Sequence, residues 1–184
     1  MILSGISRGR VRAVLFGLGM ATALATGAQA LDTSQLSAMS AEQIAEEAAY
    51  VHPAQLYVVA THYASRGEGA LAAQWLYAAQ LRYRFLVEAG GEAARGEGIK
   101  LGYLDVITGD PIRLYIAGNV DEWIGAMQWA LDWDDASTNT TTSKSEHAEV
   151  LQKIRLGLES MITAVDHNRD MILLDRQARQ QEIR

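Results

Sequence analysis

The 184-residue chain contains no cysteine and only two prolines. The absence of cysteine excludes disulfide bridges, a thiol nucleophile, cysteine-ligated zinc, covalently attached c-type haem and an acylated lipoprotein cysteine. Beyond Ala30 the chain also lacks any apolar run that approaches the roughly 20 residues of a membrane-spanning helix. We therefore expect a fold that is held together by an ordinary hydrophobic core and that does not insert stably into a membrane.

Sequence signatures of catalysis are equally scarce. The histidines form no His-Glu-x-x-His metal motif, and no serine stands in a nucleophile-elbow sequence. The glycines from Gly96 to Gly102 have the wrong spacing for a dinucleotide-binding loop. The sequence thus favours a binding or scaffolding role over catalysis, and it predicts no cofactor.

Residues 1–30 have the three parts of a cleavable signal peptide. Their charged side chains are Arg8, Arg10 and Arg12. An apolar stretch over 13–24 follows, which as a helix would be only about 18 Å long, far short of the roughly 30 Å hydrocarbon core of a membrane. Ala28-Gln29-Ala30 then matches the small-x-small pattern that signal peptidase cleaves. We predict cleavage after Ala30 and a periplasmic or secreted protein that spans residues 31–184 as one domain.

Removal of this segment makes the protein more acidic. The whole chain has 16 basic and 22 acidic residues, and loss of three arginines leaves 13 against 22, a formal net charge of −9. Nucleic acids and anionic membrane surfaces are bound chiefly through Lys and Arg, so an acidic domain suits neither. We therefore expect a protein or peptide as the partner and no nucleic acid. The oligomeric state is left open by the sequence.

Helical periodicity and capping residues recur along the predicted mature chain. Ser40 and Gln43 form a capping box that predicts a helix over about 41–51, ended by His52-Pro53. Apolar residues at helical spacing predict two more helices on either side of a turn at 66–69, and the second is apolar over so much of its circumference that it should be central. After a glycine-rich loop, residues 99–108 fit a helix or a strand, and we favour the helix. The expected fold class is all-α, a compact antiparallel helical domain.

The helix pair over residues 53–88 resembles one helix-turn-helix unit of the tetratricopeptide or Sel1-like repeats. The matching positions are the small residues Ala60, Ala72 and Ala79, the bulky residues Tyr63 and Leu76, and Gly67 at the turn. Leu56 replaces the usual tryptophan, and no second copy follows at a period of about 34 residues. The resemblance therefore implies a single hairpin as readily as a repeat array. The pentapeptide Leu81–Phe85 is also similar to a sequence in exported proteobacterial proteins, which implies no activity.

Capping patterns divide the C-terminal half as well. Asp110-Pro111 has the pattern of an N-cap followed by proline at the first helical position, and it predicts a short helix that ends at Gly118. Asn119 is the expected N-cap of the next helix. The low-complexity polar segment 136–145 predicts an exposed loop. The polar end of the chain predicts a C-terminal helix over 166–184 that projects from the body.

Three closely spaced carboxylates, Asp132, Asp134 and Asp135, form the most chemically suggestive cluster. Hard cations such as calcium bind several oxygen atoms at close range, although the glycine and distal glutamate of an EF-hand loop are missing here. Two interpretations stay open. The cluster is either a group of solvent-exposed loop charges, which we favour, or a cation site of a metal-dependent enzyme.

Arg82 and Arg84 interrupt the apolar helix that follows the turn. A lone charge is costly to bury, so at least one of them should point inward and form an ion pair. The candidate acidic partners are Glu46, Glu47 and Glu88. In the alternative interpretation, an arginine between two aromatic residues anchors an acidic partner, because Arg and Tyr are enriched at interface hot spots.

The leading functional hypothesis is an exported helical interaction module or scaffold that holds a protein or peptide on the surface of the hairpin. Its predicted contact residues are Gln74, Tyr77, Gln80 and Arg84. Small size, acidity and export also fit a periplasmic inhibitor or immunity protein that blocks a secreted toxin or a cell-wall hydrolase. A metal-dependent hydrolase that uses the carboxylates of residues 132–135 is the remaining alternative.

Overall fold

The computed structural model describes residues 39–182, and in that range helices are joined by short connections without any strand. The all-α class and the helical choice for residues 99–108 are therefore confirmed. The predicted signal peptide and its cleavage site lie outside the described residues. None of the helices within 39–182 is long and apolar enough to cross a membrane.

The first helix, α2 (Ala41–Glu46), begins at the predicted capping box. The backbone N–H of Gln43 donates to Ser40 Oγ, and the backbone N–H of Ser40 donates to Gln43 Oε1 at 2.7 Å. The helix ends earlier than the predicted residue 51. Residues 47–51 form turns instead, and several carbonyl groups of this segment accept hydrogen bonds from Arg82 and from the connection before α8.

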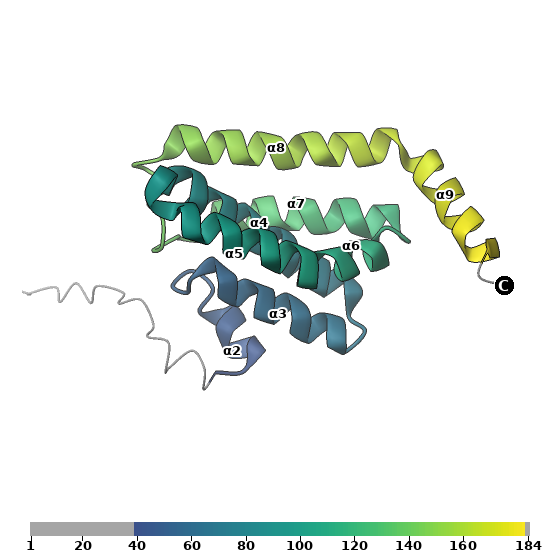
Figure 1. The fold of residues 1–184 in the computed structure, drawn as a ribbon, viewed down its shortest axis with the longest axis horizontal. Coiled ribbons are helices and arrows are strands. Elements are labelled where there is room, and N and C mark those ends of the chain that lie inside the picture. Colours follow the sequence, from purple (N-terminus) through teal and green to yellow (C-terminus); the bar gives the residue numbers. More distant parts are fainter. Residues whose placement is uncertain (1–38, 183–184) are drawn as a thin grey trace, which may run out of the picture.

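Helices α3 (Pro53–Ser65) and α4 (Gly69–Gly90) form the predicted antiparallel hairpin. Gly67 closes the turn with a φ of 76°, a left-handed conformation that a glycine adopts without a steric penalty. Figure 1 shows α4 in the middle of the molecule, between α3 and α8. The side chains of Ala72, Leu76 and Ala79 are fully buried, so α4 is the central helix, as its apolar circumference predicts.

A continuous helical run follows α4, made of η1 (Gly91–Ala94), α5 (Arg95–Leu104), the π-helical turn η2 (Asp105–Gly109) and α6 (Asp110–Ile116). The glycine-rich loop predicted here is therefore wrong. So is the N-cap at Asp110, because its φ of −60° and ψ of −46° are helical. Pro111 has no N–H to donate, and the wider π-helical turn just before it lets the helix continue through the proline.

The C-terminal half contains α7 (Val120–Ala136), α8 (Ala148–His167) and α9 (Arg169–Glu182). Asn119 caps α7 as predicted, since its side-chain oxygen accepts from the N–H of Glu122 at 3.3 Å. Helix α8 lies along one side of the body, and α9 bends away from it at Asn168 (Figure 1). Helix α9 nevertheless contacts the body, because Arg169 donates to Asp121 at 2.7 Å, Arg176 donates to the carbonyl oxygen of Leu114 at 3.4 Å, and Ile172 packs against the core. The prediction of a C-terminal helix that projects from the body is therefore not confirmed.

His52 caps α3 through a contact that depends on its protonation. Its Nδ1 accepts from the backbone N–H of Ala54 at 3.2 Å, which only the uncharged imidazole can do. Burial lowers the pKa of His52, against the weaker opposing attraction of Glu97. The stability that comes from this histidine is therefore fully present above its unfolded pKa of about 6.5, and it is lost as the pH falls from there toward the lowered pKa.

The variant His52→Asn tests this pH dependence. An asparagine side chain caps a helix through its amide oxygen and does not titrate. We expect the melting temperature of the variant to fall less steeply than that of the wild type as the pH drops below about 6.5. Identical slopes in thermal melts of the two proteins would show that His52 does not contribute.

Candidate functional site

A groove of about 240 Å³ lies between α4 and α8. The apolar side chains that line it are Leu81, Ile154, Leu158 and Met161. Gly157, in the middle of α8, also lines the groove, and a Cβ atom added there would meet no other atom within 4 Å. Because Gly157 has no side chain, this wall of the groove has open space at the middle of α8, and the groove is accessible from solvent there.

Three of the four predicted contact residues, Tyr77, Gln80 and Arg84, line this groove. They lie three and four positions apart on α4 and therefore on one helical face. Gln74 is half-buried and does not line the groove. The predicted position on an open hairpin surface is wrong for Tyr77 and Gln80, because α4 is covered on this side and leaves them only 1% and 5% exposed.

Asp105, the first residue of the π-helical turn, organises the polar wall of the groove. Its Oδ1 accepts from the Tyr57 hydroxyl at 2.6 Å and from Gln80 Nε2 at 2.8 Å. Burial, together with the hydrogen bond to Asp105, raises the pKa of Tyr57. Tyr57 is therefore a permanent donor, and the Asp105 carboxylate is held in place from both α3 and α4.

Arg84 lies near Asp105 without a hydrogen bond to it. Its Nη2 is 3.8 Å from Asp105 Oδ2, and its side chain is 48% exposed. Gln80 uses its amide nitrogen on Asp105, and within residues 39–182 its carbonyl oxygen has no hydrogen-bond partner. The groove thus offers the guanidinium donors of Arg84 and the carbonyl acceptor of Gln80 beside its apolar side chains.

The other polar side chains that line the groove each make one hydrogen bond or ion pair. The Tyr77 hydroxyl accepts from Trp123 Nε1, and burial raises the pKa of Tyr77. Lys153 donates to Glu88 at 3.0 Å across the α4–α8 gap. Within residues 39–182, Arg84 and the Gln80 carbonyl make no hydrogen bond, so their hydrogen-bonding capacity is the largest that the groove leaves for another molecule, beside the O–H of Tyr77, which accepts there without donating.

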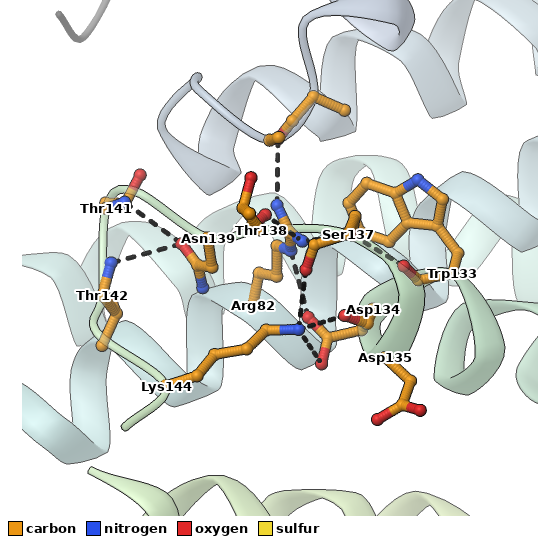
Figure 2. A network of polar contacts seen from close by, with 12 residues as sticks. Arg82, Trp133, Asp134, Asp135, Ser137, Thr138, Asn139, Thr141, Thr142 and Lys144 are labelled. Atoms are coloured by element: carbon orange, nitrogen blue, oxygen red, sulfur yellow. Dashed lines mark hydrogen bonds and ion pairs between the residues drawn. The ribbon is translucent and has the colours of Figure 1, made fainter. Parts of the chain in front are cut away.

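A second polar cluster is centred on Arg82, which is only 2% exposed (Figure 2). Its guanidinium donates to Asp134 Oδ1 at 3.2 Å and to the carbonyl oxygen of Ala48 at 3.0 Å. It also donates to Ser137 Oγ at 2.6 Å and to the carbonyl oxygen of Thr138 at 2.8 Å. The predicted inward arginine is confirmed, but its acidic partner is Asp134 and none of the three glutamates.

The same cluster corrects the interpretation of the polar segment 136–145. Residues 137–147, which we name the strap, hold the turns after α2 through the hydroxyls of Thr140 and Thr141, which donate to the carbonyl groups of Ala49 and Val51 at 3.1 and 3.2 Å. Lys144 donates to the backbone carbonyl of Asp134. The strap is therefore not simply an exposed loop. Its polar side chains hold it against the body through hydrogen bonds, where an apolar segment would use hydrophobic contacts.

The three carboxylates of residues 132–135 do not converge on one point. Asp134 is fully buried, contrary to the favoured interpretation of solvent-exposed loop charges, and it forms ion pairs with Arg82, Lys144 and Arg155. Asp132 accepts from Gln128 at 2.9 Å, and Asp135 is 82% exposed and points away from the cluster (Figure 2). No group of three acidic or histidine side chains that could hold a metal ion occurs within 39–182.

Comparison of the chain with protein families, with curated proteins and with solved structures finds no match. Helices α3 and α4 form an antiparallel hairpin, and its membership of the tetratricopeptide or Sel1-like class stays a prediction.

Proposed function

We propose that the protein is an exported helical interaction module that holds a segment of a partner protein in the α4–α8 groove. The observation that carries the proposal is the combination of an open apolar groove with the unused hydrogen-bonding groups of Arg84 and Gln80. Export is supported by the signal-peptide pattern of residues 1–30.

The size and lining of the groove favour a side chain of a protein over a small molecule. Its volume of about 240 Å³ lies below the roughly 300–1,000 Å³ of pockets that enclose small ligands and cofactors. Apolar residues surrounded by polar ones, with tyrosine and arginine among them, are typical of the centre of a protein interface. The groove therefore suits one or two side chains that project from a partner.

Blocking the groove at Gly157 tests this proposal. A phenylalanine at this position would extend from α8 into space that is empty now, and replacement of a mid-helix glycine should not weaken the helix. We expect Gly157→Phe to fold with an unchanged or higher melting temperature and to bind groove ligands at least about tenfold more weakly, a loss of about 1.4 kcal/mol. The probes are peptides selected on the wild-type protein from a random phage-displayed library, then synthesised and titrated by calorimetry.

Gly125→Phe is the matched control. Gly125 also lies inside a helix, α7, is exposed, and has no atom within 4 Å of an added Cβ, but it does not line the groove. This variant should bind the selected peptides like the wild type. Failure to select any peptide, or equal binding by the wild type and Gly157→Phe, would contradict the proposal.

A further inference from the structure

We infer that the segment held in the groove presents an aspartate or glutamate side chain to Arg84 and a large apolar side chain to Ile154, Leu158 and Met161. This inference rests on the proposed function and names the class of partner, an acidic and apolar peptide segment. It follows from the unused hydrogen-bonding groups of Arg84 and Gln80 and from the positive charge of Arg84.

The guanidinium of Arg84 has its full set of donors available. An arginine side chain carries five N–H donors in a planar fork, and within residues 39–182 none of them makes a hydrogen bond. The fork matches the two oxygen atoms of a carboxylate, which makes such pairs shorter and stronger than neutral hydrogen bonds. A carboxylate is therefore the ligand group that Arg84 is best suited to bind.

Asp105 cannot fill this role from inside the protein. Its Oδ1 is fixed by Tyr57 and Gln80, and its Oδ2 stays 3.8 Å from Arg84 Nη2, beyond hydrogen-bond distance. Asp105 thus attracts the arginine to the edge of the groove and leaves its donors free. Lys153 also lines the groove, but it already donates a hydrogen bond to Glu88 at 3.0 Å, whereas Arg84 is the lining cation that makes no hydrogen bond within residues 39–182.

The rest of the groove defines what accompanies the carboxylate. Ile154 and Leu158 are half-buried and Met161 is exposed, and together they form an apolar surface that a leucine, methionine or phenylalanine side chain would cover and remove from water. The free carbonyl oxygen of Gln80 can accept a backbone N–H of the same segment. A peptide supplies all three groups at once, whereas a free carboxylic acid supplies only the first.

The test uses the peptides selected on the wild-type protein, each in an acidic form and in a form with Asn or Gln in place of Asp or Glu. For the wild type we expect the amide form to bind at least about tenfold more weakly, because a charge-assisted hydrogen bond is lost. The Arg84→Gln variant should bind both forms equally. A double-mutant cycle of peptide and protein then isolates the Arg84 to carboxylate interaction.

Asp105→Asn distinguishes binding by Arg84 from a purely structural role. Asparagine keeps an oxygen that accepts from Tyr57 and Gln80 but removes the negative charge that competes for Arg84. This variant should bind the acidic peptides several-fold more tightly than the wild type and bind the amide forms without change. A residue that only supports the fold would give a loss of affinity for both forms, and that result would overturn the inference.

Three further outcomes are informative. If the selected peptides lose affinity in Gly157→Phe but contain no Asp or Glu, or are insensitive to Arg84→Gln, the inference fails while the proposed function stands. If amidation of the peptide C-terminus abolishes binding and side-chain replacement does not, the carboxylate is a chain terminus, and the inference fails in its stated form. If binding is insensitive to Gly157→Phe, the proposed function itself fails.

Discussion

Asp134→Ala is expected to lower the free energy of unfolding by about 3–5 kcal/mol, because it leaves the buried charge of Arg82 without its counter-ion. The side chain of Asp134 is only 1% exposed, and it also faces Lys144 and Arg155 at 3.3 and 3.4 Å. Loss of one carboxylate therefore leaves three cations without their shared partner. Urea denaturation followed by circular dichroism measures the change as a shift of the midpoint at an unchanged slope.

Asp135→Ala is the matched control for this experiment. Asp135 is the next residue in α7 and has the same charge, but its side chain is 82% exposed and 4.0 Å from Arg155. Its removal should change stability by no more than about 0.5 kcal/mol, as for most exposed sites. Comparable effects of the two substitutions would mean that Asp134 acts only through the net charge of the protein, which would refute the ion-pair explanation.

The second large effect is expected in the centre of α4. Leu76 is fully buried against the helices around it, and Leu76→Ala should destabilise the protein by about 2–5 kcal/mol through lost apolar contacts and a residual cavity. Leu71 lies in the first turns of the same helix and is 38% exposed. Leu71→Ala should cost about 1 kcal/mol or less, because the side chain is partly hydrated before the substitution. Similar losses at both positions in chemical denaturation would contradict the central placement of α4.

Much of the fold was predictable because helices are specified locally. The capping box at Ser40, the glycine turn at Gly67 and the cap at Asn119 each act within a few residues, and the structure contains all three. The choice of helix for residues 99–108 is right for the same reason. Asp110-Pro111 shows the limit of such patterns, because the preceding turn widens and lets the helix continue through a sequence that typically starts one.

The contacts that join distant segments were not predictable. Arg82 and Asp134 are 52 positions apart, and nothing near either residue indicates the other. The candidate glutamates lie closer to Arg82 in sequence or on its own helix, whereas the packing of α4 against α7 selects Asp134. Likewise, the polar composition of the strap predicts exposure, and only the nearby carbonyl groups of Ala49 and Val51 explain why it is held against the body.

The candidate site lies between these two cases. The row of Tyr77, Gln80 and Arg84 follows from helical spacing alone, and the structure places that row in one groove. The opposite wall comes from α8, far away in the sequence, so neither the burial of Tyr77 nor the opening at Gly157 could be anticipated. Asp105 was missed because a single aspartate inside an ambiguous segment carries no local signal.

The four hydrogen bonds of Arg82 have a consequence for how the protein opens. They join α4 to the turn after α2, to the end of α7 and to the strap. If any one of these three segments detaches, at least one N–H group of the buried guanidinium loses its acceptor, which costs free energy. The amide protons of these segments should therefore exchange together as one cooperative unit. Helix α9 takes no part in these four hydrogen bonds, so its amide protons can exchange independently of this unit.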